Sequence, residues 1–378
     1  MKRAAVLTLL LALFLVRAAR ADVIDRLDTP VLRPLARALA VSVGKSLPVP
    51  AASSGITFTF DPKTSAFVRD TEVVGQVFLE RAQPIGRGRL NVSVTYQYVD
   101  TDEYEGHPLD SLKDLNPIRD PKSGKLFIIP SIDFSLITHE ITTSVTYGVT
   151  DDAEVNLTIP VLHTTGDVSG RLIQLGGGAS PIQRGASLDS EVGVGDIFLR
   201  GKYRLLHGSW GDLGAGLLFR LPSGNEDNFQ GTGLFEVSPR AYASTPVVEL
   251  APYVRVQAFL NAGLDLVPQD GSRGEGRYGV GIDILLATRL TLSVAFLARE
   301  PFGRLISPSA ISVPRANGGS SPIFGINPGH PSYYDLSVGG RVNIWRDTVF
   351  GMWNVTVPVN DQGIRATVVP LAGIEVAW

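Results

Sequence analysis

Basic side chains on one face of an extended segment are the residues of this sequence most able to do chemistry. In GDIFLRGKYRLL (195–206), Arg200, Lys202 and Arg204 alternate with apolar residues, so they share one face of a strand. Rings of basic groups in a water-filled pore favour anions. Later segments place further charged residues on the same polar face, and we predict that all of them line a lumen: Arg220, Arg240, Arg255, Arg341, Asp283, Asp335 and Glu375.

Two interpretations of these charged residues remain open. In the first, the basic residues near 200–255 form a track that attracts anionic or aromatic-carboxylate solutes. In the second, the arginines pair with acidic residues and stiffen the interior, and the acidic residues available for this are Asp196, Glu236, Asp283 and Glu375.

A hydrolytic site would need a serine, a histidine base and a polar group that orients the base. His139 and His163 lie in or beside predicted strands, with Ser135 and Ser169 in their neighbourhoods. The spacing of these residues forms no dyad. The adjacent acids at 151–152 fall in a short connection and fit the chemistry of a turn. We therefore expect no catalytic residue and no enzyme activity.

Two clusters of oxygen ligands, at 100–105 and 225–228, raise the question of calcium, because hard cations prefer several carboxylate oxygens. The first cluster contains Asp100, Asp102, Glu103 and Glu105. Both fall in predicted loops, where a solvated surface is the simpler interpretation, so no metal and no cofactor are expected. The chain has no cysteine, which excludes disulfides and thiolate chemistry. Its net charge of −3 argues against a nucleic-acid partner.

Strands must position these residues, because one period-two unit repeats along the chain. In RLNVSVTYQYVD (89–100), apolar and polar residues alternate without a break, as in a strand with two different faces. We expect an all-β fold in which about 12 strands fit residues 89–378, and a further pair at 55–60 and 71–82 would make 14. The unit recurs in 152–162, 195–206, 251–263, 277–286, 289–300, 333–345, 348–359 and 365–378.

Short and long connections alternate between these segments. Outer-membrane barrels have short periplasmic turns and long outer loops, so the alternation favours a transmembrane antiparallel up-and-down β-barrel. The short connections are 149–152, 206–212, 244–249, 286–289 and 345–348, and the longer ones, rich in Gly, Pro, Asn, Asp and Ser, are 101–130, 164–191, 222–234, 264–276 and 301–332.

The apolar faces are expected to contact the lipid bilayer. An arginine that faces lipid at mid-depth costs about 2–4 kcal/mol, and the apolar faces, such as that of 290–296, are almost free of charge. Aromatic residues near the strand ends would form the girdles that such barrels carry at both interfaces. The candidates are Tyr98, Tyr147, Tyr203, Trp353 and Trp378.

The first 88 residues differ from this pattern. Residues 1–21 contain Lys2 and Arg3, a short apolar run and a small-x-small site at 19–21, which predict a cleaved signal peptide. Residues 22–88 are expected to form a periplasmic or plug segment ahead of a barrel at 89–378. The predicted location is the bacterial outer membrane, because no apolar run is long enough for a spanning helix and only closed barrels otherwise satisfy the backbone in lipid.

Several segments resemble the bacterial outer-membrane transporter family named for a MetA pathway of phenol degradation. They are 78–99, 147–162, 192–206, 218–233 and the aromatic carboxyl end, in matching order. Membership would imply an outer-membrane barrel that takes up small, often aromatic or hydrophobic compounds. The alternating run 373–378, which ends in Trp378, is similar to the signal that the barrel assembly machinery reads. We expect a passive channel or transporter for small-molecule solutes; the alternatives are a structural or surface-binding barrel with a closed lumen and, less favoured, an outer-membrane hydrolase.

Overall fold

The computed structural model describes most of the chain from residue 40 onward. The described ranges are 40–51, 58–61, 66–69, 77–109, 112–119, 126–174, 182–286, 289–303, 305–314, 320–345 and 348–378. Residues 1–21, where a signal peptide is predicted, lie outside these ranges. The part of the chain that the structure describes contains no helix long and apolar enough to cross a membrane.

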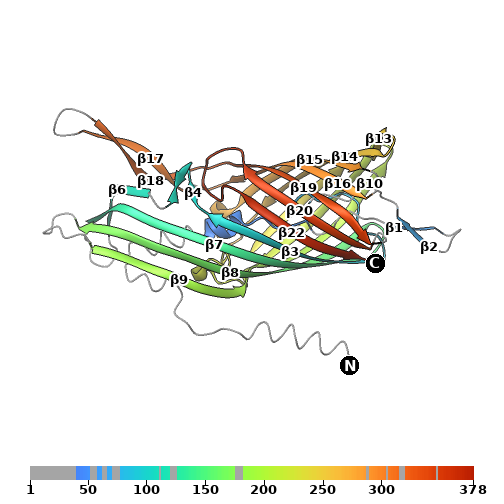
Figure 1. The fold of residues 1–378 in the computed structure, drawn as a ribbon, viewed down its shortest axis with the longest axis horizontal. Coiled ribbons are helices and arrows are strands. Elements are labelled where there is room, and N and C mark those ends of the chain that lie inside the picture. Colours follow the sequence, from blue (N-terminus) through green and yellow to red (C-terminus); the bar gives the residue numbers. More distant parts are fainter. Residues whose placement is uncertain are drawn as a thin grey trace, which may run out of the picture.

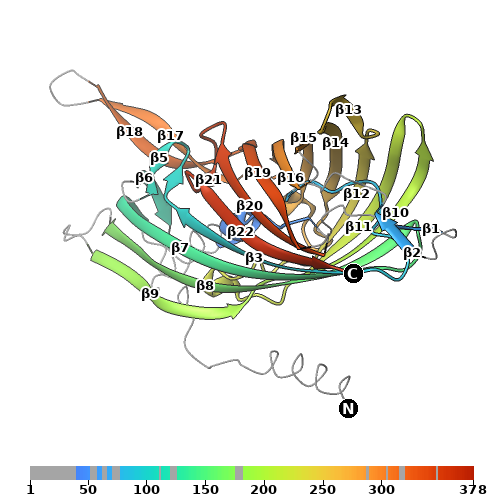
Figure 2. The same ribbon diagram turned by 45° about the vertical axis from the view of Figure 1, so that its right-hand side comes forward.

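Twelve antiparallel strands of the described chain close into a barrel (Figures 1 and 2). Each strand pairs with the next along the chain, and the first strand pairs with the last through Val94 and Ile374, among others. Alternating residues with few interior prolines form these strands because each residue can then present one side chain to each face. The barrel strands are β3 (Leu90–Thr101), β7 (Leu126–Gly148), β8 (Ala153–Gln174), β10 (Ile197–Gly208), β11 (Gly211–Leu221), β12 (Glu236–Ser244), β14 (Val254–Asp265), β15 (Glu275–Leu286), β16 (Leu290–Pro301), β19 (Tyr333–Trp345), β20 (Val349–Pro358) and β22 (Val369–Ala377).

The prediction of an all-β barrel with 12 strands is confirmed. The alternative of 14 is wrong, because the described parts of the two extra segments do not join the barrel; residues 55–57 and 71–76 lie outside the described ranges. Strands β1 (Phe58–Asp61) and β2 (Ala66–Arg69) pair only with each other in the described sheets, and residues 77–82 form no strand.

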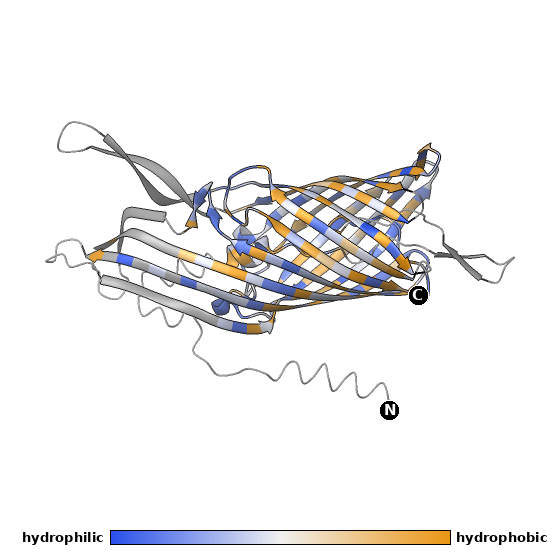
Figure 3. Ribbon diagram, viewed as in Figure 1, coloured by the Kyte–Doolittle hydropathy of each residue, from blue (hydrophilic) through white to orange (hydrophobic). Residues whose placement is uncertain are grey.

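Outward and inward side chains differ sharply in type. On β3, Val94 and Tyr96 are 46% and 44% exposed, whereas Thr95 and Gln97 between and beside them are 3% and 2% exposed. The same parity holds on β10, where Tyr203 is exposed and Lys202 is buried. Figure 3 shows this alternation of hydrophobic and hydrophilic residues along the barrel strands. The exterior is therefore apolar and the interior polar, the reverse of a water-soluble protein.

The two ends of the barrel are built differently. Tight turns and the carboxyl terminus lie at one end, where Leu90 and Trp378 exchange backbone hydrogen bonds of 2.8 and 3.0 Å. The opposite end carries a hairpin, in which residues 305–314 pair with 320–329, and the extended ends of β7 and β8 (Figure 1). The remaining elements are β4 (Glu103–Tyr104), β5 (His107–Pro108), β6 (Leu112–Arg119), β9 (Ile182–Val194), η2 (Glu226–Asn228), β13 (Val248–Ala251), η3 (Gly271–Arg273), β17 (Leu305–Pro314), β18 (Ser320–Gly329) and β21 (Ile364–Arg365).

Three of the connections predicted as loops contain strands. Residues 301–332 include the β17–β18 hairpin, 101–130 include β4 to β6, and 164–191 are mostly taken up by β8 and β9. Polar composition indicated loops, yet backbone pairing continues beyond the apolar band because a strand with water on both faces can carry polar side chains on both.

Two segments that precede the barrel lie inside it. Residues 40–46 form a short helix, and Ala40 and Val43 in that helix are fully buried. Residues 77–86 follow as a buried extended stretch. Together with 47–51, we name them the plug segments. The helix is visible within the barrel in Figures 1 and 2.

Candidate functional site: the plugged lumen

The first plug segment is held by arginines from two parts of the barrel wall. Arg220 on β11 donates from Nη2 to the carbonyl of Gly44 at 2.8 Å. Arg299 on β16 and Arg277 on β15 donate to the carbonyl of Lys45 at 2.9 and 3.4 Å. The Lys45 ammonium lies 3.1 Å from Oε1 of Glu236 on β12. From the other side of the ring, Gln97 of β3 donates to the carbonyl of Pro48 at 3.1 Å, so the wall contacts this segment from several directions and the segment lies within the lumen.

The second plug segment steps along the wall from strand to strand. The Glu80 N–H donates to Oδ1 of Asn261 on β14 at 2.7 Å, and the Ala82 N–H donates to Oγ of Ser244 on β12 at 2.9 Å. Nearer the barrel end that carries the carboxyl terminus, the Ile85 N–H donates to a carboxylate oxygen of Glu154 on β8 at 2.7 Å. Backbone groups that would be orphaned inside a barrel are thus satisfied by inward side chains.

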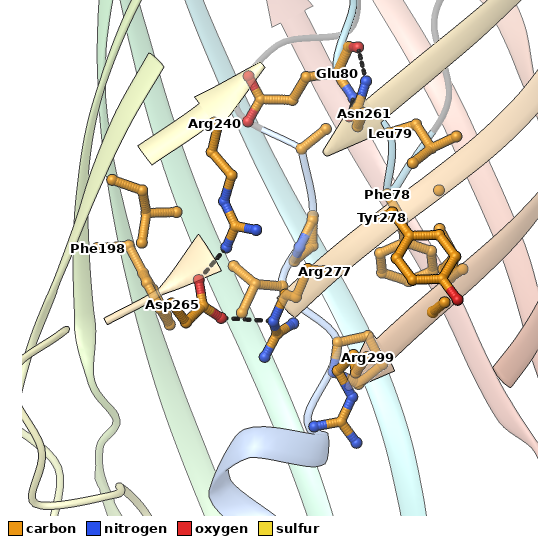
Figure 4. Close-up of a pocket in the computed structure, with 18 of the residues that line it drawn as sticks. Phe78, Leu79, Glu80, Phe198, Arg240, Asn261, Asp265, Arg277, Tyr278 and Arg299 are labelled. Carbon is orange, nitrogen blue, oxygen red and sulfur yellow. Dashed lines mark hydrogen bonds and ion pairs between the residues drawn. The ribbon is translucent and has the colours of Figure 1, made fainter. Parts of the chain in front are cut away.

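Asp265 at the end of β14 links two arginines of neighbouring strands (Figure 4). Its carboxylate contacts Arg240 of β12 through Oδ1, and Oδ2 lies 2.6 Å from Nε of Arg277 on β15. Gly263 makes the first contact feasible, since a Cβ there would lie 2.4 Å from Cδ of Arg240. Arg277 also pairs with Glu275, so two arginines and two carboxylates lie together in this part of the wall.

Arg200, Lys202 and Arg204 lie at alternate positions of β10, and each has different partners. Arg200 donates to the Pro50 carbonyl at 2.9 Å and lies 3.5 Å from Glu80, so both contacts are to plug segments. Lys202 lies 2.8 Å from Glu154 and donates to the Arg81 carbonyl at 3.0 Å. Arg204 sits at the turn end and lies 2.7 Å from Asp152.

Arg220 and Arg341 meet acidic partners within the barrel wall. Nε of Arg220 donates to Asp196 at 2.8 Å, and Arg341 of β19 contacts Glu375 of β22. Asp196 also accepts hydrogen bonds from the backbone and hydroxyl of Thr232, at 2.9 and 2.8 Å. It therefore anchors the 222–234 loop over the lumen.

The other predicted lumen residues lie in three settings. Arg255, near the turn end of β14, is partly exposed and faces Glu249 of β13 in the register. Asp283 is fully buried and accepts a hydrogen bond from Ser293 at 2.7 Å. Asp335 lies 3.6 Å from Arg365 of β21, at the barrel end remote from the carboxyl terminus.

Several residues of this network escaped the sequence prediction, among them Lys45, Glu80, Asp265, Arg277 and Arg299. The strand residues among them could have been found by parity, because Arg277 is on the same face of its strand as Asp283. Asp265 fell in a predicted loop although β14 extends to it. The plug residues had no periodic signal, because their positions depend on wall contacts more than 180 residues away.

A cavity of about 190 Å³ remains between the plug segments and the wall. Charged groups of Lys45, Arg240 and Arg299 line it together with the apolar side chains of Phe78 and Leu79. Figure 4 shows several of these residues around the cavity. The site therefore combines guanidinium groups with an apolar surface.

The histidines and serines considered for a catalytic dyad lie on β7, β8 and β9. Ser135 and His139 lie four residues apart on β7, about 13 Å along a strand. Ser190 was not among the predicted partners, yet its Oγ lies 2.7 Å from Nε2 of His163 on the outer surface. His163 stacks on His139, with ring centroids 5.6 Å apart. Neither contact supplies the carboxylate or amide that orients a general base.

The acidic clusters bind other parts of the chain. Asp102 accepts hydrogen bonds from the Thr367 backbone and hydroxyl at 3.1 and 2.9 Å, and Glu105 accepts from the Gly363 N–H at 2.9 Å. Asn225 caps the one-turn helix η2 by accepting from the Asp227 N–H. Within the described ranges, no group of three or more potential metal ligands comes together.

Comparisons with known proteins give only distant likenesses. No family model matches the sequence, and no curated protein matches it. An outer-membrane channel from Pseudomonas putida F1 is 14% identical over 80% of this chain and 100% of that chain, with a TM-score of 0.47. The NanC porin is 7% identical (76% and 98% covered, TM-score 0.38), and the CymD monoaromatic hydrocarbon channel is 10% identical (78% and 89% covered, TM-score 0.36). At such scores these likenesses carry no information on function.

Proposed function

We propose that this chain is an outer-membrane channel for small molecules, closed at rest by its plug segments. The observation that carries the proposal is the inverted barrel, apolar outside and charged inside. A bilayer accepts such an exterior, and a closed ring leaves no backbone group unpaired in lipid. Export by a cleaved signal peptide, assembly through the last strand with Trp378, and relationship to the MetA phenol-degradation family belong to the same proposal.

The contacts of the plug segments support a gate rather than a permanent filling. Hydrogen bonds and ion pairs hold both segments to the wall, and water can replace such contacts. The one apolar cluster found there among the described residues is small, comprising Val77, Met352 and Leu371 with Phe78 packed on it. Buried ion pairs stabilise a fold less than apolar packing of similar volume, so a purely structural barrel would gain from an apolar interior.

A structural barrel with a closed lumen is the second candidate. It is favoured by the pairing of lumenal arginines such as Arg220 and Arg341 with acidic residues. A hydrolase is supported less, since the one Ser–His contact described above lacks an orienting group.

Conductance in planar bilayers separates the two candidates. The refolded mature chain is compared with a variant that lacks residues 40–51, which line the lumen without contributing a barrel strand. We expect rare openings of the intact chain and steady conductance of the variant. A variant that folds, as shown by heat-modifiable migration on gels, but never conducts would refute the channel and leave the structural barrel.

A further inference from the structure

Backbone carbonyls of the first plug segment occupy the arginines of the lumen. Arg220 binds the carbonyl of Gly44, Arg299 and Arg277 bind that of Lys45, and Arg200 binds that of Pro50. Four strands thus hold one short peptide through neutral acceptors. These hydrogen bonds already have a charged donor, but a carboxylate adds a full opposite charge and can accept two parallel N–H bonds from one guanidinium.

The lumenal carboxylates are already paired by geometry that does not involve these carbonyls. Asp265 lies between Arg240 and Arg277, and Glu236 lies between Lys45 and Arg220. The carbonyl contacts are therefore the weaker half of each arginine's coordination. An incoming anion would compete with them before it competed with the wall carboxylates.

The cavity beside these carbonyls is lined by basic and by apolar side chains. Arg200, Arg277 and Arg299 reach it, and so do the apolar side chains of Phe78, Phe198 and Leu297. Its volume of about 190 Å³ suits one ring or a short alkyl chain. A molecule with a carboxylate and an apolar body can contact both kinds of side chain. The carboxylates that also line the cavity each have a basic partner: Glu80, Glu236, Asp265 and Asp335.

We propose that small carboxylates with an apolar body open the channel by displacing the carbonyls of Gly44, Lys45 and Pro50 from the lumenal arginines. The solute itself is then the signal that releases the plug. This inference rests on the proposed channel function and names both its solute class and its control. Exchanging a carbonyl for a carboxylate adds the attraction between two full charges, which at about 4 Å in bulk water shifts the balance toward release by about fivefold.

Cysteine labelling tests the release directly, because the native chain has no cysteine. Ser46→Cys places a thiol in the half-buried part of the plug that borders the cavity. Ser209→Cys, in the exposed turn between β10 and β11, is the matched control. Both full-length mature variants are refolded into liposomes and labelled with a water-soluble maleimide in the presence of benzoate or benzamide, which share shape but differ in charge.

We expect benzoate to raise the labelling rate of Ser46→Cys at least about fivefold, with no change for benzamide or for the control thiol. Equal acceleration by benzamide, or none by either compound, would overturn the inference. The conductance experiment tests the channel function independently of this labelling experiment. If the chain without residues 40–51 conducts while benzoate leaves Ser46→Cys unchanged, the channel stands and carboxylate-driven opening falls.

Discussion

The bridging carboxylate of Asp265 provides the strictest test of the lumenal network. Its side chain is 3% exposed, and it contacts Arg240 and Arg277 at once. With charge centres about 4 Å apart and an effective dielectric constant of about 20, each attraction is about 4 kcal/mol. The two attractions sum to about 8 kcal/mol, from which desolvation of the carboxylate removes several kcal/mol. We therefore expect Asp265→Asn to lower the free energy of unfolding by about 3–5 kcal/mol.

Urea unfolding of the protein refolded into lipid vesicles measures this loss, with an unchanged slope showing that the unfolded state is unaltered. Asp270→Asn is the matched control, because Asp270 forms a similar pair with Arg273 at 3.3 Å but both side chains are about half exposed. Hydrogen bonds from Ser272 lower the pKa of the Asp270 carboxyl, and asparagine caps η3 equally well. We expect a much smaller effect from this control.

A second variant shows how much of the stability lost in Asp265→Asn comes from leaving Arg240 without its acid and how much from lost packing. In Arg240→Met with Asp265→Asn, no arginine is left without an acid, because Arg277 keeps Glu275. We expect this double variant to regain about 1–4 kcal/mol relative to Asp265→Asn alone. A single variant within about 0.5 kcal/mol of the native chain, the usual range for surface substitutions, would refute the assignment of Asp265 as a buried bridge.

Three further outcomes follow from other parts of the barrel. Val280→Arg, on the 50% exposed outer face of β15, should cost about 2–4 kcal/mol in vesicles, and an unchanged urea midpoint would contradict a lipid-facing surface. Gly148→Ala places a Cβ 1.7 Å from the Gly86 carbonyl oxygen and should cost about 1–3 kcal/mol in thermal unfolding, whereas Gly201→Ala, with nothing within 4 Å, should be tolerated. Asp196→Asn removes the partner of Arg220 and Thr232, at a local cost of about 3–5 kcal/mol, so limited proteolysis should cut the 222–234 loop faster; identical digestion patterns would show that Asp196 does not hold this loop.

The sequence by itself determined the barrel, because strand periodicity is a local property. Alternation in segments such as 89–100 and 289–300 sets which side chains share a face, and a face without charge can meet lipid. The same parity placed Arg200 and Lys202 toward the interior. The turn ends and the strand count also followed from the spacing of Gly- and Asp-rich connections, although strand pairing beyond the apolar band extended β8 further than its polar composition indicated.

Only the tertiary structure decided what the lumenal charges bind. Arg200 meets Pro50 and Glu80 rather than a neighbour on its own strand, and Asp265 joins arginines from two other strands. Closing the sheet into a ring brings inward side chains of several strands within reach of the same plug residues, and that closure depends on tilt and register summed around the whole ring. The sequence left residues 22–88 as either a periplasmic or a plug segment, and the wall contacts of 40–51 and 77–86 place these two stretches inside the barrel.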